Sequence, residues 1–342
     1  MRKLGLFLAV IVVVTGAWLL LVTFLPLGAD TLVSAAQPTT NRDEALARWA
    51  VVQDRDDETI DPRCRSWSLL HDEPVETTVV LFHGYTNCPY QWRRLGEELY
   101  ARGWNVIAPR LPRHGYADKL TSEQGEFTAE DLIAAADEAI DVAVGLSDEV
   151  VVGGISGGGS VAVWVAQNRP DVDRVVALAP EVNLGVIPSW FARQVANTFL
   201  VLPDIQVWWD LNKRESIPPD YGYPKFSTHA VAQLIRLGQA TLEQAKASAP
   251  GVDDVLLTTN RNDQAVNIAT VEDLVAAWRE GGADATIYEW PEAMGLAHNM
   301  VDDVVNAEHF EEVYPILIEL FTSGEGAAAE GEPGDALALS DR

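Results

Sequence analysis

The stretch "VVVGGISGGGSVAV", Val150–Val163, places three β-branched residues before five glycines that surround Ser156. Each glycine inside regular structure costs roughly 0.5–1 kcal/mol relative to alanine, so five of them require a steric reason. A serine on a sharp strand-to-helix turn supplies one, because side chains two residues before and after it have no room; here those positions are Gly154 and Gly158. The stretch therefore predicts a nucleophilic serine, with the Gly157 N–H at a helix N-terminus where a developing anion is stabilised.

Two other glycine-rich motifs are alternatives for this stretch. A phosphate-binding loop requires G-x-x-x-x-G-K-[ST], and the stretch contains no lysine. The string "GGGSVA" resembles a loose dinucleotide fingerprint, but that fingerprint belongs to the first strand of its fold rather than the third. The sequence around Ser156 favours the nucleophile turn.

Strand and helix patterns alternate along most of the chain. β-Branched runs that are apolar on both faces predict a mostly parallel sheet with helices on both sides, in an α/β fold. Thr128, with Asp131 three residues later, predicts a helix N-cap. Strands are expected at 77–82, 104–109, 149–153, 172–180, 253–259 and 285–290, and helices at 88–104, 128–146, 160–170, 271–282 and 306–321.

The domain organisation follows from where this alternation stops. Residues 44–180 and 251–322 form the expected core, and 181–250, which are rich in aromatic residues and show no clear strand, are expected to be a helical cap inserted into it. An ordinary part of the core is the alternative for 181–250. Residues 323–342 are acidic and of low complexity, which predicts disorder.

The N-terminal 30 residues differ from the rest. Leu4–Leu27 carries no charge and follows Arg2 and Lys3, which predicts a membrane anchor with the catalytic domain outside the cytoplasm. A cleaved signal peptide, leaving a secreted protein, is the alternative. Residues 28–43 are expected to be a polar linker.

Charge and cysteine content bear on partners and compartment. The 342-residue chain has a net charge of −27, which argues against nucleic acid as a partner. Cys64 and Cys88 are the only cysteines, and outside the cytoplasm a single pair is expected to form a disulfide. Two unrelated buried thiols are the alternative.

Four segments together resemble the α/β-hydrolase fold family, in its carboxylesterase, monoglyceride-lipase and serine-aminopeptidase-like branch. They are "LFHGYT" (81–86), "GGISGGG" (153–159), "TTNRNDQAV" (258–266) and "GLAHNMV" (295–301). The resemblance covers about residues 60–322. It implies a parallel sheet with a cap and a serine, acid and histidine in that chain order.

Candidate catalytic residues follow from that order. Asp263 is the expected acid and His298 the expected base, because each follows one of the last two strands; Asp303 and Glu181 are alternative acids. The resemblance implies that the backbone N–H of Tyr85 is the second oxyanion donor beside Gly157. The other histidines, none of which lies in a loop after the last strand, are not expected to act as the base: His71, His83, His114, His229 and His309.

The resulting expectation is a serine hydrolase that cleaves carboxylic esters without a metal or organic cofactor. Its expected substrate is a small-molecule ester with an apolar acyl chain, because aromatic residues would roof the pocket. An aminopeptidase, thioesterase or acyltransferase with the same three residues is one alternative. A non-catalytic, membrane-anchored binding module is the other.

Overall fold

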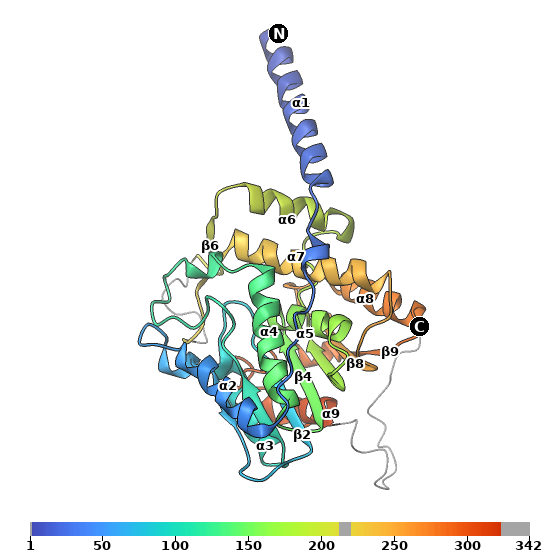
Figure 1. Cartoon of the computed structure of the whole chain (residues 1–342). Helices are drawn as coiled ribbons and strands as arrows, with labels where there is room; N and C mark the ends of the chain where they lie inside the picture. Colours follow the sequence, from blue (N-terminus) through green and yellow to red (C-terminus); the bar gives the residue numbers. More distant parts are fainter. Residues whose placement is uncertain (1, 212–219, 323–342) are drawn as a thin grey trace.

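A seven-stranded sheet forms the centre of the molecule (Figure 1), whose computed structural model describes residues 2–211 and 220–322. The strand order is β1-β3-β2-β4-β5-β8-β9, and only β1 is antiparallel to its neighbour within this sheet. All six strands expected from the sequence are present, which confirms the mostly parallel α/β sheet. The bounds are β1 Trp67–Leu69, β2 Thr77–Phe82, β3 Asn105–Ala108, β4 Glu149–Ile155, β5 Arg174–Leu178, β8 Asp254–Asn260 and β9 Asp284–Trp290.

Helices cover both faces of the sheet because side chains of opposite parity along each strand enter two separate apolar cores. In β4, Val150 and Val152 pack into one core, while Val151 and Ile155 pack into the other. The first core lies under α2 Arg42–Asp54, α4 Ala129–Val144, α5 Gly157–Asn168, α7 Thr228–Ala245 and α8 Ile268–Glu280. The second lies under α3 Arg93–Tyr100 and α9 Phe310–Thr322.

Helix ends follow the capping signals in the sequence. The Thr128 hydroxyl accepts a hydrogen bond from the Asp131 N–H, and the Asp131 carboxylate accepts one from the Thr128 N–H. This reciprocal pair satisfies two N–H groups that the first turn of α4 leaves without intrahelical partners. The α2 helix and the β1 strand were not expected, because α2 has weak periodicity and β1 is only three residues long.

The expected cap contains strands as well as helices. α6 Ala192–Val201 and α7, which both lie within residues 181–250, pack on each other. The sequence of this segment shows no clear strand, yet β6 Gln206–Trp208 and β7 Lys225–Ser227 form a small antiparallel sheet. Three residues are too few to establish an alternating pattern in the sequence.

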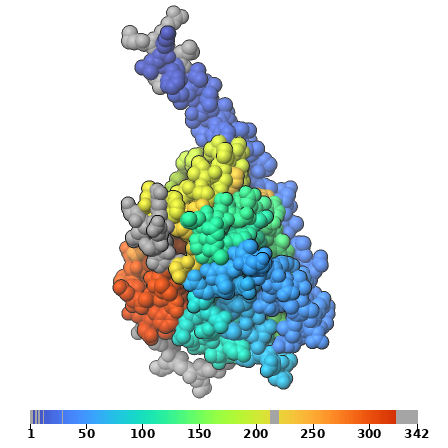
Figure 2. Space-filling model, turned by 90° about the vertical axis from the view of Figure 1, so that its left-hand side faces the viewer, coloured from blue at the N-terminus to red at the C-terminus, as the bar shows by residue number. Residues whose placement is uncertain are grey.

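The N-terminal helix α1, Arg2–Phe24, projects from the body at the cap end (Figures 1 and 2). Its last turn is held by α6, where the Asn197 side chain donates to the backbone carbonyls of Val22 and Leu25. Within residues 2–211 and 220–322, no helix combines the length and apolar composition required to cross a membrane. The expected spanning anchor or signal helix is therefore not supported.

The segment that follows α1 is not a free linker. Leu32 is fully buried, and its carbonyl accepts a hydrogen bond from the Trp164 indole of α5. Further along, Ser34 donates to the carboxylate of Asp137 in α4. The expectation of a linker over 28–43 was wrong because its small residues fit closely against the helices. The expected disordered tail, 323–342, lies outside the described residues.

Candidate active site

Ser156 occupies the turn between β4 and α5 with φ 56° and ψ −118°. This left-handed backbone is unfavourable for a residue with a Cβ and is found where the surrounding structure enforces it. The turn lies at the carboxyl end of a central strand, so the serine side chain reaches the crevice beyond the sheet edge. Ser156 is only partly buried.

The neighbouring glycines are required by close backbone contacts. A Cβ added at Gly158 would lie 2.1 Å from the Phe82 carbonyl oxygen, and one at Gly154 would lie 2.1 Å from the Gly158 carbonyl oxygen. At Gly159, a Cβ would lie 2.7 Å from the Pro180 Cα. The sequence-based expectation of steric clearance around the serine is therefore consistent with the observed packing.

His298 and Asp263 lie in contact, although 35 residues separate them in the sequence. The Nδ1 atom of His298 is 2.6 Å from Oδ2 of Asp263, whose side chain is fully buried. The second carboxylate oxygen of Asp263 accepts the Ala265 N–H at 2.7 Å. These bonds orient the imidazole, and no hydrogen bond to its Nε2 atom is present among the described residues. Of the three acids considered, Asp263 contacts the imidazole, whereas neither Glu181 nor Asp303 forms a hydrogen bond with it in the described structure.

The loops that carry this pair are joined directly. Asp263 follows β8 and His298 follows β9, which pair in parallel from Asp254 to Asn260. The Asn260 side-chain amide donates to the Leu296 carbonyl at 2.9 Å. Adjacent strands therefore bring the carboxylate and the imidazole to one edge of the sheet.

A cavity of about 500 Å³ opens at this edge, and both Ser156 and His298 line it. No hydrogen bond joins these two side chains in the described structure. Catalytic hydrogen bonds are commonly long in a ligand-free site and shorten when substrate binds. The remaining lining is largely apolar and includes cap residues, among them Val186, Trp209 and Phe226.

The loop after β2 lies against the N-terminus of α5. A Cβ at Gly157 would lie 3.0 Å from the Tyr85 backbone nitrogen, so the two backbone amides are close together. The Tyr85 hydroxyl accepts the N–H of Ser227 at 2.8 Å and thereby fixes the loop to the cap. Burial raises the pKa of the Tyr85 phenol well above its usual value, so it remains neutral.

Gln91 connects the two loops that flank the cavity. Its Oε1 accepts the Gly84 N–H at 2.8 Å, and its Nε2 donates to Oδ1 of Asn299 at 2.6 Å. Gly84 precedes Tyr85, and Asn299 follows His298. The buried amide of Gln91 thus links the loop that contains Tyr85 to the loop that contains His298.

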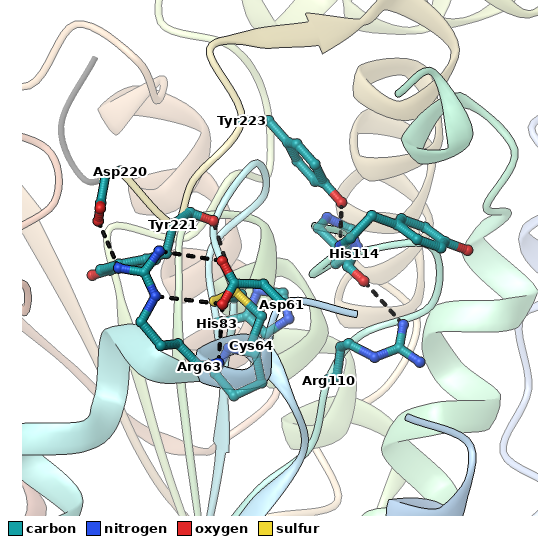
Figure 3. The surroundings of a disulfide bond; sticks show 12 residues. Asp61, Arg63, Cys64, His83, Arg110, His114, Asp220, Tyr221 and Tyr223 are labelled. Atoms are coloured by element: carbon teal, nitrogen blue, oxygen red, sulfur yellow. Dashed lines mark hydrogen bonds and ion pairs between the residues drawn. A yellow bond between two sulfur atoms is a disulfide. The ribbon is translucent and has the colours of Figure 1, made fainter. Parts of the chain in front are cut away.

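Cys64 and Cys88 form a disulfide, which confirms the expected pairing. It packs with Ile60 and with Tyr221 of the cap segment in a small apolar cluster. Figure 3 shows Tyr221 beside Cys64 at this junction. Two residues further, the Tyr223 N–H donates to the Thr86 carbonyl at 2.7 Å. The disulfide therefore lies where the loop after β2 meets the cap.

Two other histidines near the site are structural. His83 is fully buried, and its Nε2 accepts the Leu111 N–H at 3.0 Å. Burial lowers its pKa well below the usual value, with the neighbouring His114 contributing. Burial likewise lowers the pKa of His114 to about 4, so both rings are neutral near pH 7.

A family model described as alpha/beta hydrolase fold matches residues 77–215. Among solved structures, a monoacylglycerol lipase of Paleococcus ferrophilus superposes with a TM-score of 0.58, covering 75% of this chain and 98% of that chain at 19% identity. The chain has the α/β-hydrolase fold. A soluble variant of monoglyceride lipase from Saccharomyces cerevisiae, in complex with a substrate analog, gives a TM-score of 0.56 at 12% identity, covering 76% of this chain and 92% of that chain.

One curated relative has higher identity over a shorter segment. The thermostable monoacylglycerol lipase of Bacillus sp. (strain H-257) is 30% identical over 113 residues, which are 32% of this chain and 43% of that lipase. The aligned segment thus spans less than half the length of that relative. The structural similarity, at 12–19% identity, shows the fold.

Sequence reasoning missed two residues at the site of this α/β-hydrolase chain. Gln91 lies in the expected helix 88–104 and Asn299 in the segment 295–301 that contains His298, and no local pattern signals that the two side chains meet. Glu181 was noted only as an alternative acid, yet it is buried and lines the cavity. Within the described residues, no group of three or more histidine, cysteine, aspartate or glutamate side chains could hold a metal ion.

Proposed function

We propose that this α/β-hydrolase chain is a serine hydrolase that cleaves carboxylic esters through an acyl-enzyme. The observation that carries the proposal is the pairing of His298 with the buried Asp263 at the cavity that Ser156 also lines. A serine hydroxyl becomes a useful nucleophile only when an adjacent base removes its proton. These three residues supply the nucleophile, the base and the group that orients the base.

In the first half-reaction, His298 Nε2 accepts the proton of the Ser156 hydroxyl as Oγ attacks the ester carbonyl carbon. The tetrahedral intermediate collapses, the ester C–O bond breaks, and the imidazolium returns the proton to the leaving alcohol. In the second half-reaction, water loses a proton to His298 and attacks the acyl group, releasing the carboxylic acid and restoring Ser156. Asp263 holds the tautomer in which Nδ1 carries hydrogen, and it stabilises the imidazolium.

The proposed oxyanion donors are the backbone N–H groups of Tyr85 and Gly157. Their closeness supports this assignment, and the N-terminus of α5 adds a favourable partial charge. Removing one donor of this kind typically costs about 10²–10³ in rate. Backbone donors are preorganised, so they require little rearrangement when charge develops.

The proposed substrate is a small-molecule ester with an apolar acyl chain. Support comes from the cavity, whose walls include Leu184, Val186 and Val231 together with aromatic rings of the cap. The Bacillus relative is named a monoacylglycerol lipase, so a monoacylglycerol-like ester is the proposed substrate class.

Aminopeptidase activity is less well supported by the same cavity. A peptidase that binds a substrate amine requires a negative charge near the nucleophile. Among the described lining residues, Glu181 has the single carboxyl group. Burial, together with the charge of Asp263, raises the pKa of Glu181 to about 8, so this group is largely neutral at pH 7.

Labelling with a fluorophosphonate probe tests the proposed chemistry, because the probe phosphonylates an activated serine. The wild-type protein is expected to be labelled once, on Ser156, and a Ser156→Ala variant should not be labelled. A His298→Ala variant should react far more slowly while keeping its fold. Wild-type protein that remains unlabelled, with its disulfide intact, rules out the serine hydrolase proposal.

We also propose that the catalytic domain resides outside the reducing cytoplasm. The Cys64–Cys88 disulfide supports this, because such bonds persist chiefly in oxidising compartments. Thiol alkylation of protein taken directly from cells is the test. Both cysteines should resist alkylation until a reductant is added, whereas immediate alkylation of both contradicts the proposal.

A further inference from the structure

Glu181 is a buried carboxyl group that the proposed mechanism does not use. It follows the strand β5 and is only 5% exposed, yet it lines the cavity that contains Ser156 and His298. Its Oε1 atom is buried without a hydrogen-bond partner in the described structure. Leaving such a group unsatisfied costs about 1–3 kcal/mol. Its position in the cavity wall therefore indicates that a bound ligand supplies the missing hydrogen-bond partner.

The backbone of Glu181 is fixed to the nucleophile turn from two sides. Its N–H donates to the Ser156 carbonyl at 3.0 Å, and its carbonyl accepts the Ser160 hydroxyl at 2.8 Å. The backbone that carries the carboxyl group therefore has a defined position relative to the serine, and burial of the side chain restricts where the carboxyl group can lie. Groups held in this way can select a substrate, because they cannot move aside to avoid a mismatch.

We propose that the Glu181 carboxyl group is a specificity-determining group that donates a hydrogen bond to an uncharged oxygen of the ester substrate, such as a free hydroxyl group. This inference rests on the proposed ester hydrolysis and identifies which esters the site favours. In a largely apolar cavity, one polar group at a fixed position discriminates strongly between a substrate that completes its hydrogen bond and one that leaves it unpaired.

The surroundings of Glu181 favour its protonated form. Burial and the nearby Asp263 carboxylate raise its pKa to about 8. The other titratable groups around the cavity do not offset this effect: Tyr85 and Tyr223 are phenols whose pKa values are raised by burial, and His298 is engaged with Asp263. A protonated carboxyl donates a hydrogen bond to an oxygen that has no hydrogen of its own, whereas a carboxylate only accepts hydrogen bonds or attracts a cation.

Three octanoate-type esters test the inference, because they differ only in the number and position of their hydroxyl groups. The first is propyl octanoate, the second is 2,3-dihydroxypropyl octanoate, and the third is the propyl ester of a hydroxyoctanoic acid. The readout is the ratio of kcat/KM between a hydroxylated ester and propyl octanoate. This ratio does not depend on how much of a variant is correctly folded, because both substrates meet the same active enzyme.

Two variants of nearly equal size separate the hydrogen bond from packing. Glu181→Met removes the donor and is expected to lower the ratio roughly 3- to 10-fold, the range for one neutral hydrogen bond. Glu181→Gln keeps an N–H donor and should retain most of the ratio. If Glu181→Met lowers the ratio for the dihydroxypropyl ester, the bonded oxygen lies on the alcohol side of the substrate. If it lowers the ratio for the hydroxyoctanoate ester, that oxygen lies on the acyl side.

A pH series adds a second readout. The probe for this series is the same ester with a methyl ether in place of the hydroxyl, because an ether oxygen only accepts hydrogen bonds. Above pH 8 the wild-type kcat/KM ratio of this ether to propyl octanoate should fall as Glu181 ionises, whereas the ratio of Glu181→Gln should stay level. A wild-type ratio near one for both hydroxylated esters overturns the inference, as does an unchanged ratio in Glu181→Met. A preference for an ester that carries a trimethylammonium group, lost in Glu181→Met, also overturns it in favour of a cation site.

Failure of the inference is distinguishable from failure of the proposed function. If Ser156 is labelled by a fluorophosphonate and propyl octanoate is hydrolysed, but the ratios do not respond to Glu181, only the role of Glu181 is wrong. If neither labelling nor hydrolysis occurs in the wild-type protein, the ester hydrolase proposal itself is wrong.

Discussion

Replacing Glu181 by Gln should change how the stability of the protein depends on pH. The pKa of this carboxyl rises from its ordinary value of 4.5 to about 8 because it is buried beside Asp263. The folded state therefore binds the proton more tightly than the unfolded chain. Stability from this group is fully present below about pH 4.5 and is lost as pH rises through about 8. Glutamine does not ionise, so the stability of the variant does not fall in this way as the pH rises.

The size of the effect follows from the same pKa change. Each tenfold change in proton affinity corresponds to ~1.36 kcal/mol, so a rise from 4.5 to about 8 sets an upper limit of about 5 kcal/mol. Water penetration and side-chain rearrangement around an ionised carboxyl reduce this, and about 2–4 kcal/mol is expected. The unfolding free energy of Glu181→Gln, relative to that of wild type, should therefore rise by about 2–4 kcal/mol between pH 5 and pH 9.

Denaturant unfolding followed by tryptophan fluorescence measures the difference. Wild type, Glu181→Gln and the exposed control Glu58→Gln are unfolded at pH 5, 7 and 9 with the disulfide intact. The free-energy difference between wild type and the control should stay level across this range. If the difference between wild type and Glu181→Gln also varies by less than about 0.5 kcal/mol, Glu181 is not buried in a protonated state and the reasoning fails.

Three further changes test the geometry around the cavity. Gly158→Ala places a Cβ 2.1 Å from the Phe82 carbonyl oxygen, so we expect esterase activity to fall at least 100-fold and the melting temperature to drop; near-normal kinetics would contradict the clearance argument. Gln91→Leu breaks the bond to Gly84 and the bond to the histidine loop, and we expect kcat to fall about tenfold with little change in KM, whereas a change in KM alone would argue against a positioning role. Replacing Cys64 and Cys88 by serine should cost roughly 2–4 kcal/mol of unfolding free energy, measured with denaturant, and the same stability with and without reductant in wild type would disprove a stabilising bridge.

The central fold could be predicted from the sequence because its signals are local. Runs such as Val150–Val152 identify strands by composition alone, and the glycines around Ser156 report a steric requirement that few other structures impose. The order of serine, acid and histidine then limited the candidates to particular loops. Asp263 and His298 were selected by position, and the structure places them in contact.

The parts that sequence reasoning missed depend on contacts between distant segments. The β6 and β7 strands are too short for periodicity, and the segment around Leu32 contains too few large apolar residues to indicate that it packs against α5. Gln91 acquires its role only because the loops after β2 and β9 converge. The burial of Glu181 likewise follows from tertiary packing, since a glutamate in a loop is usually exposed.

The most direct measurement of the central claim is the position of the acyl group during turnover. The protein is mixed with a p-nitrophenyl ester, quenched in acid within the first turnover, digested and analysed by mass spectrometry. We expect one equivalent of p-nitrophenol released in the initial phase and an acyl group on Ser156 in the peptide that contains Val150–Val163. Ester turnover with no acyl group on Ser156, or with the acyl group on another residue, would contradict the account.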